Sequence, residues 1–185
     1  MTPEEIISKY YAQQPALHHI LLTHSRAVAE RAVSICDRHP ELHADRQFVY
    51  EAAMLHDIGI LHTNAPGIEC HGTEPYIIHG YLGGQMLRRE GLERHARVAE
   101  RHTGTGLTAE AIQSQGLPLP QQDWSPESIE EVIICYADKF YSKSNLERIK
   151  TPQQVARSLE KFGQQGVEIF LNWYRRFEAT ESEIL

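Results

Sequence analysis

The sequence predicts an all-α protein, and two observations lead to this fold class. Apolar residues recur at spacings of three and four along most of the chain, as they do on one face of an α-helix. Convincing runs of alternating β-branched residues are missing. At 185 residues, of which 41% are hydrophobic and 23% charged, the chain is long enough for one domain with a real core and short for two. We therefore expect a single domain over residues 1–185.

The first two predicted helices are separated by a short break. One is expected over residues 3–12, and a longer one from residue 16 to the proline at position 40, because proline cannot continue a helix. Three apolar residues recur on the inward face of the longer helix: Val28, Ala32 and Ile35. His24 lies one turn before them, so we expect its side chain to point inward as well.

The third predicted helix ends in a His-Asp pair. Asp45 has the position of an N-cap, and the segment RQFVYEAAMLHDIG carries an apolar stripe that leads to Gly59 as the expected stop. His56 and Asp57 then fall in the last turn of this helix. The residues from 61 to 75 are rich in Gly, Pro, Asn and Thr, which is typical of a loop.

Helical patterns also fill the second half of the chain. We expect one helix from about residue 76 to Gly91, another through LERHARVAERH, and a short one through LTAEAIQSQG. Ser125 is the expected N-cap of the next helix, with Pro126 at its first position. A last helix is expected over residues 151–178, followed by a polar tail.

Composition excludes several classes of function. The formal net charge of −7 provides no broad basic surface, so we expect no binding to duplex nucleic acid. No window approaches the roughly 18 apolar residues that span a bilayer, and the first residues lack a signal-peptide core, so we expect a cytoplasmic protein without membrane contact. The cysteines at positions 36, 70 and 135 are few and widely spaced, which argues against disulfides and zinc knuckles.

Histidines are the first sign of function, since the chain contains eleven. Six histidines and aspartates lie on predicted helices or helix ends beside small or apolar residues: His24, His56, Asp57, His79, His102 and Asp138. Each of them taken alone has an ordinary structural explanation. Together, imidazoles and carboxylates suit Fe, Mn, Zn, Ni or Co, and six ligands exceed what one tetrahedral ion needs. If they converge, they are enough for two ions that share a bridging carboxylate.

Five segments resemble the HD superfamily of metal-dependent phosphohydrolases. EAAMLHDIGI is similar to the family's HDIG signature, and LLTHSRAVAERA, IIHGYLGGQML, ERHTGTGLTAEAI and IICYADKF resemble its other motifs in the same order. The resemblance covers roughly residues 16–144. The HTG segment and the YADK ending are especially similar to HD enzymes that cleave dinucleoside tetraphosphates. The implied fold is a helical bundle with a metal site in its central cleft.

The resemblance also implies roles for individual residues. His24, His56, Asp57 and Asp138 would hold a first divalent transition metal, with Fe or Mn favoured. Asp57 would bridge to a second ion, completed by His79 and His102, and would orient a bridging hydroxide.

One position departs from the family pattern. Ile60 stands where many HDIG proteins have a lysine that faces phosphate. We expect His62, Arg101 or Lys139 to supply the substrate-binding charge instead.

The expected function is hydrolysis of a phosphate ester or anhydride, in a nucleotide or dinucleotide, by a metal-bridging hydroxide. One alternative is a di-iron oxygenase of the same fold, which uses the same six-ligand pattern. Another is a non-catalytic nucleotide-binding module, although that predicts at least one damaged metal position and all six are intact. The oligomeric state stays open, with a homodimer as one alternative.

Overall fold

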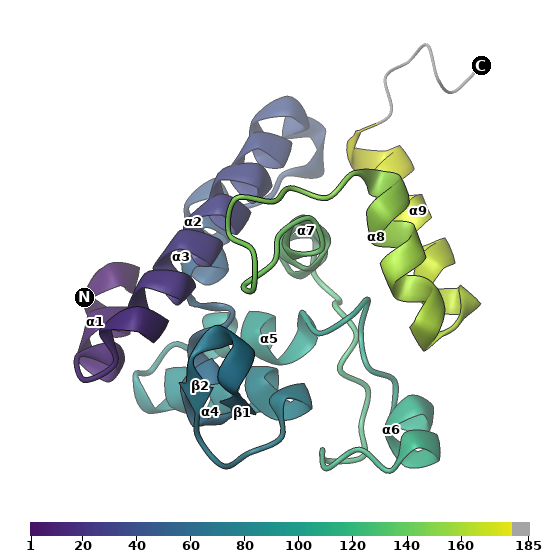
Figure 1. Cartoon of the computed structure of the whole chain (residues 1–185). Coiled ribbons are helices and arrows are strands. Elements are labelled where there is room, and N and C mark those ends of the chain that lie inside the picture. Colours follow the sequence, from purple (N-terminus) through teal and green to yellow (C-terminus); the bar gives the residue numbers. More distant parts are fainter. Residues whose placement is uncertain (179–185) are drawn as a thin grey trace.

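The computed structural model describes residues 1–178 and confirms the all-α fold class (Figure 1). The predicted polar tail after residue 178 lies outside the described residues. The α-helices are α1 (Pro3–Tyr11), α2 (Pro15–Arg38), α3 (Arg46–Leu55), α4 (His79–Arg89), α5 (Glu93–Arg101), α6 (Ala109–Gln115), α7 (Ile129–Asp138), α8 (Pro152–Leu159) and α9 (Gln164–Phe177). Short 3-10 helices occur at η1 (Pro40–Leu42), η2 (Ile58–His62), η3 (Pro66–Ile68), η4 (Tyr76–Ile78) and η5 (Glu160–Phe162).

Helix α7 occupies the middle of the molecule. It is seen nearly end-on at the centre of Figure 1, and it packs against α2, α3, α5 and α9. Its apolar side chains are buried on more than one face, including Ile133, Ile134 and Tyr136. A helix that is apolar all round belongs in a core. Its C-terminal end therefore delivers Asp138 to the interior rather than to the surface.

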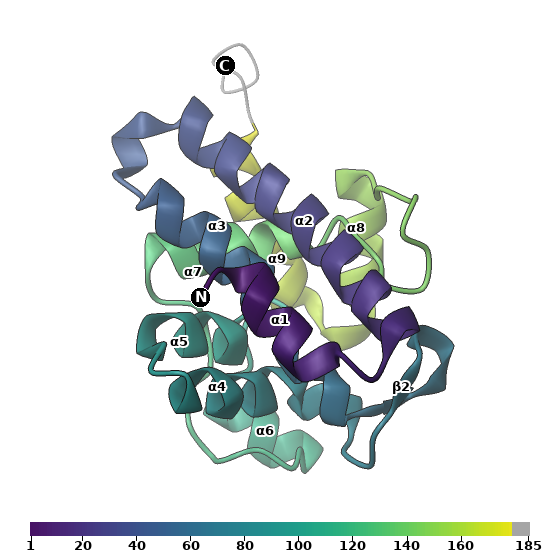
Figure 2. The same ribbon diagram turned by 90° about the vertical axis from the view of Figure 1, so that its left-hand side faces the viewer.

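The N-terminal helices form one side of this core. Helix α2 packs against α1, α3 and α7, and Figure 2 shows it running diagonally across the molecule beside α1. The predicted inward residues Val28, Ala32 and Ile35 are fully buried, and His24 is buried beside them. The spacing of apolar residues thus predicted correctly which face of α2 is inside.

The end of α3 differs from the prediction. Asp45 is the N-cap as expected, since its side chain accepts a hydrogen bond from Phe48 N at 3.1 Å. Gly59, however, is not a helix stop: α3 ends at Leu55, and the chain continues after Asp57 as η2. A Cβ on Gly59 would lie 2.1 Å from the His79 carbonyl oxygen. The glycine is required because η2 and α4 approach closely there.

The predicted loop from 61 to 75 contains a small hairpin. Strand β1 (Asn64–Ala65) pairs antiparallel with β2 (Cys70–His71), with η3 between them. Backbone hydrogen bonds from Thr73 and Glu74 to the His62 carbonyl fasten the hairpin to the end of η2. The segment is therefore folded as a small hairpin and lies beside the end of α3.

Two other helix boundaries also differ from the prediction. Helix α7 is capped by Ser128 and not by Ser125, because Ser128 and Glu131 form a reciprocal capping box. The expected last helix is two helices, α8 and α9. Gly163 separates them with a φ of 105°, a conformation that other residues rarely adopt. Thr151 caps α8 as its sequence suggested.

Other expectations concern the surface and the cysteines. None of the helices described over residues 1–178 is long and apolar enough to cross a membrane. The three cysteines are unpaired and buried.

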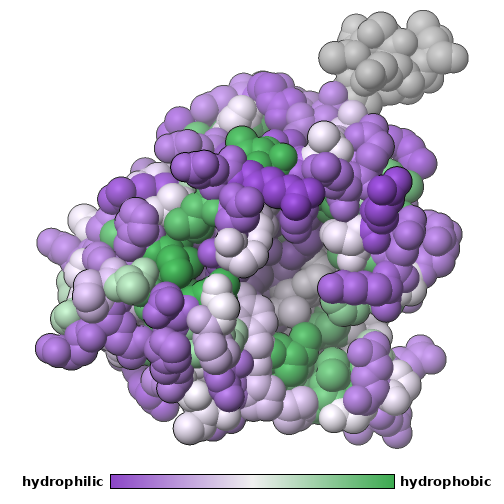
Figure 3. All heavy atoms as spheres, viewed as in Figure 1, coloured by the Kyte–Doolittle hydropathy of each residue, from purple (hydrophilic) through white to green (hydrophobic). Residues whose placement is uncertain are grey.

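In the space-filling view, the face seen in Figure 1 is hollowed near its centre, with apolar side chains beside the hollow (Figure 3).

Candidate metal centre

The six predicted ligands come from the ends or interiors of five helices that meet at one point. His24 lies inside α2, His56 and Asp57 directly follow α3, and His79 begins α4. His102 directly follows α5, and Asp138 is the last residue of α7. The side chain of Asp138 is 12% exposed, and the other five ligands are buried. The structure thus brings together all six residues that the sequence singled out.

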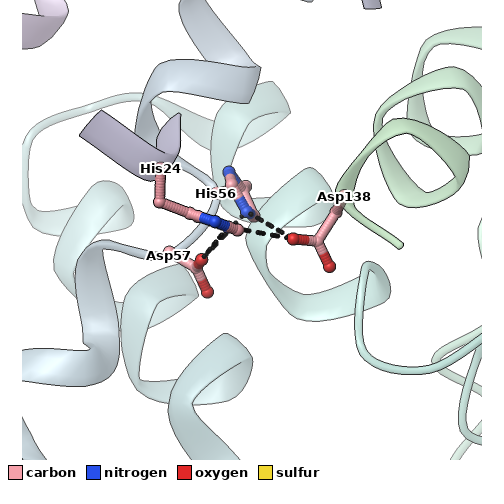
Figure 4. A group of neighbouring side chains, drawn as sticks. All are labelled: His24, His56, Asp57 and Asp138. Carbon is pink, nitrogen blue, oxygen red and sulfur yellow. Dashed lines mark hydrogen bonds and ion pairs between the residues drawn. The ribbon is translucent and has the colours of Figure 1, made fainter. Parts of the chain in front are cut away.

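Four of them form a first group (Figure 4). The Nε2 atom of His24 lies 3.1 Å from Asp57 Oδ2 and 3.0 Å from Asp138 Oδ1. The Nε2 atom of His56 lies 3.0 Å and 3.5 Å from the same two oxygens. These four ligand atoms are within 4.8 Å of one another, which is close enough for all of them to contact one ion.

A second group uses the other oxygen of the same aspartate. Asp57 Oδ1 lies 3.3 Å from the Nε2 atoms of both His79 and His102. Those two nitrogens are 3.0 Å apart. Asp57 therefore presents one oxygen to each group, as a bridging carboxylate between two ions would.

Hydrogen bonds orient three of the imidazoles. The Nδ1 atoms of His56, His79 and His102 each lie 2.6–2.7 Å from the carbonyl oxygen three residues earlier. A carbonyl only accepts, so each Nδ1 carries a proton and donates, and the Nε2 atom of each ring faces the centre. This arrangement, in which the outer nitrogen donates to a backbone carbonyl, is typical of histidines that bind metals.

The donor atoms fit divalent cations. With both Nδ1 atoms protonated, the Nε2 lone pairs of His79 and His102 face each other across 3.0 Å, an arrangement that repels unless a cation lies between them. In addition, His56 Nε2 and Asp57 Oδ1 are buried and make no hydrogen bond to the described residues. Buried polar atoms of this kind require a partner, and imidazole with carboxylate suits a transition metal.

Burial and neighbouring charges shift the pKa values in the centre. Burial lowers the pKa of His102 to about 4, which keeps its imidazole neutral. Burial alone would also lower the pKa of His56, but the Asp57 and Asp138 carboxylates raise it to about 9. For Asp57, burial favours the neutral acid, yet the charges of His56 and Lys143 hold its pKa well below the usual range. The Asp57 carboxylate is therefore ionised.

Lys143 is a member of the site that the sequence analysis missed. Its Nζ lies 2.5 Å from Asp57 Oδ2, and its side chain is 12% exposed. Lys143 stands five residues after Asp138, in the loop that follows α7. Its only sequence signal is a second lysine after YADK. By contrast, Ile60 is fully buried in the hydrophobic core, so no cation is expected at its position.

The three predicted substrate-binding residues differ in their surroundings. Lys139 Nζ contacts Asp138 Oδ2 at 2.8 Å and the His102 carbonyl at 3.1 Å, so it lies at the centre. Arg101 instead donates to the Ser125 carbonyl and to Glu127, which argues against a phosphate contact. His62 is exposed at the end of η2 and lines a separate shallow pocket.

A pocket of about 430 Å³ adjoins the centre. Its lining comes from two distant segments and one tyrosine: residues 65–68, Tyr76 and residues 141–144. Tyr76 stacks on the ligand His79, with ring centroids 4.6 Å apart, and Lys143 both lines the pocket and contacts Asp57. Tyr76 and Lys143 thus both line the pocket and contact residues of the candidate centre.

Fold and site together define a helical protein with a buried His/Asp centre for divalent metals. Sequence comparison assigns this class to a family: the profile of the HD domain matches residues 21–142. The chain belongs to the HD domain family, whose domains bind divalent metal ions.

The chain is also similar to three archaeal proteins. It is 34% identical over 132 residues to a tRNA (cytidine(56)-2'-O)-methyltransferase of Picrophilus torridus, and 35% identical over 144 residues to one of Thermoplasma volcanium. These matches cover 71% and 77% of this chain but only 34% and 37% of the methyltransferases. An uncharacterized protein of Methanocaldococcus jannaschii is 35% identical, with 65% of each chain covered.

Solved structures show the same fold. The HD domain of the Listeria monocytogenes phosphodiesterase PgpH has a TM-score of 0.54 and 18% identity, over 97% of this chain and 91% of that domain. Its complex with cyclic-di-AMP has a TM-score of 0.53, over 97% and 90% of the two chains.

Proposed function

We propose that this protein is a metal-dependent hydrolase of phosphate esters or anhydrides, acting on a nucleotide or dinucleotide. The observation that carries the proposal is the sharing of Asp57 between two ligand groups, each with its own histidines. This arrangement supports a binuclear centre, in which two ions lie about 3.5–4 Å apart. Membership of the HD domain family supports the same class of reaction.

The residues of the chain have distinct roles in this proposal. Divalent ions in the centre would supply a more acidic water and would neutralise charge on the phosphoryl oxygens. Asp57 would help to hold both ions, since its two oxygens face different ligand groups. The carbonyls of Ala53, Tyr76 and Ala99 fix the rings of His56, His79 and His102, which prevents their rotation during the reaction.

The methyltransferase relatives do not favour a different reaction at this centre. The name refers to the whole proteins, and about two thirds of each lies outside the segment that matches this chain. Methyl transfer requires a methyl donor and a base, whereas six convergent metal ligands suit the activation of water at phosphorus. We infer that the matched third of those proteins and this chain share the metal centre rather than methyl transfer.

The test is phosphate release from a panel of nucleotides and dinucleotides by protein reconstituted with Mn²⁺ or Fe²⁺. We expect hydrolysis of at least one substrate, and its loss by about a hundredfold or more in His24→Asn. His19→Asn is the matched control, because His19 lies on the same helix but is exposed. An inactive panel with two bound ions per chain would contradict the proposal, and oxygen consumption by the iron-loaded protein would favour the oxygenase instead.

A further inference from the structure

We propose that the pocket beside the metal centre binds the nucleoside part of the substrate, and that Lys143 binds the phosphate at the boundary between pocket and centre. This inference rests on the proposed function and names the residues that select its substrate. It goes beyond the six metal ligands, because neither the pocket nor Lys143 belongs to them.

The pocket has the chemistry of a site for a flat, weakly polar group. One wall consists of Ala65, Pro66 and Ile68, from the hairpin that follows η2, and aromatic rings come from Tyr76 and Tyr141. Aromatic rings bind planar groups by offset stacking or edge contacts. A nucleobase therefore fits this lining better than a sugar, whose hydroxyls would be left without partners on the apolar wall.

Lys143 lies between the two parts of the site. Its ammonium contacts Asp57 at 2.5 Å, while the residue also lines the pocket between Ser142 and Ser144. Figure 1 shows the loop after α7 bending toward the β1–β2 hairpin, which brings these residues to the pocket. A ligand whose base is in the pocket thus has its phosphate near a buried cation and beside the ions.

Tyr76 joins the pocket to the centre from the other side. Its ring stacks on His79, with an interplanar angle of 24°. Tyr76 therefore contacts both the proposed base site and a ligand of the candidate centre.

Pockets for small ligands range over roughly 300–1,000 Å³. At about 430 Å³ this pocket is within that range and is large enough for one nucleoside. The pocket is also open to solvent, so its volume sets no upper limit on the size of the ligand.

Lys143 also explains how the chain functions without a lysine at position 60. The side chain of Ile60 is in the hydrophobic core, whereas Lys143 reaches Asp57 from the loop that follows α7. The phosphate-binding cation is thus supplied by a different segment.

The test measures ligand binding without turnover. Isothermal titration of metal-loaded protein is carried out with the four ribonucleoside monophosphates and ribose 5-phosphate in their phosphonate form, whose C–P bond is not hydrolysed, and with the corresponding nucleosides. We expect at least one monophosphate to bind about tenfold or more tightly than ribose 5-phosphate, since base stacking is lost in the latter. In Lys143→Met the affinity for this monophosphate falls roughly 10- to 100-fold, which is the range for one charge-assisted hydrogen bond. The affinity for the nucleoside is unchanged.

Controls separate this contact from a disturbed metal centre. Lys143→Arg retains the charge and restores binding to within a few-fold, and Lys161→Met, at an exposed lysine away from the pocket, has no effect. Metal content is measured for every variant and stays at the wild-type value. Equal affinity of all monophosphates and ribose 5-phosphate would overturn the base pocket, and unchanged monophosphate affinity in Lys143→Met would overturn the role of Lys143.

The inference and the proposed function fail in different ways. Lys143-dependent nucleotide binding by a protein that hydrolyses nothing would support the inferred binding site and contradict the proposed hydrolase. If wild-type protein and Lys143→Met hydrolyse a nucleotide with the same KM, the hydrolase is supported and the role of Lys143 is contradicted.

Discussion

Asp57 is the residue on which the candidate centre depends. Its two oxygens lie within 3.3 Å of four histidine nitrogens that belong to two groups. Such a position is costly for a carboxylate, since burial opposes its charge. Lys143 offsets part of that cost, and the convergence of four histidine nitrogens on the same carboxylate is the arrangement that a metal ion needs.

Substitutions at Asp57 and His102 should therefore have different effects on metal content. Asp57→Asn removes the charge that both groups share, and we expect it to reduce the bound metal from two ions per chain to fewer than one. His102→Ala affects only the second group, and we expect it to leave about one ion. The measurement is elemental analysis of protein reconstituted with Mn²⁺ and desalted.

A matched control for these variants is His71→Asn, because His71 is an exposed histidine of strand β2 and belongs to neither group. It should keep the wild-type content. If His102→Ala also keeps two ions, the second group is not a metal site.

The sequence predicted which six side chains converge better than it predicted the residues around them. All six proposed ligands converge because each directly follows or belongs to a helix whose inward face could be read from its apolar spacing, as for His24 and Asp138. Lys143 was missed because its contact with Asp57 depends on the path of a loop, which no periodic pattern describes. Arg101 was proposed from its place beside His102, but adjacent helical residues point about 100° apart, and its guanidinium faces Glu127.

At the scale of elements, the position of the His-Asp pair is set by close packing between η2 and α4. Gly59 and Gly83 meet there: a Cβ on Gly59 would lie 2.3 Å from Gly83 N. The φ of Gly59 is not positive, so a glycine is required there because a side chain would not fit, and not because of the backbone conformation. This contact keeps Asp57, two residues before Gly59, within reach of His79 at the start of α4.

Gly59→Ala should accordingly destabilise the protein. The added methyl group meets backbone atoms, which cannot move aside as a flexible side chain would, so we expect a loss of about 1–3 kcal/mol or more in the free energy of unfolding. Gly67→Ala is the matched control, since nothing lies within 4 Å of its Cβ. Urea denaturation followed by circular dichroism measures both variants, and equal stability of the two would show that η2 and α4 are less tightly packed than described.

Element boundaries were the least predictable part of the fold. Ser125 and Ser128 are both good N-cap residues, and the choice between them depends on Glu131, whose side chain completes the box with Ser128. The break at Gly163 was missed because the apolar pattern continues on both sides of it, in α8 and α9.

At the scale of the whole molecule, the candidate centre is the point where five helices meet. Ligands come from α2, from the segments directly after α3 and α5, and from α4 and α7. Residues 24 and 138 are 114 positions apart, yet their side chains are 3.0 Å apart. An ion bound there connects helices from most of the folded chain, and such a constellation does not exist in the unfolded state.

Metal binding should therefore stabilise the whole fold. An ion that binds only the folded state adds about 2.7 kcal/mol to the free energy of unfolding when its free concentration is 100 times its Kd. We expect the thermal midpoint to rise steadily with added Mn²⁺ and to fall after chelation, by calorimetry at fixed pH. In Asp57→Asn the midpoint should be almost independent of Mn²⁺, because the variant retains too little affinity. A wild-type midpoint that does not respond to the metal, in protein shown to bind it, would mean that the ligands bind the ion equally well in the unfolded chain, and it would contradict a centre built by the convergence of the five helices.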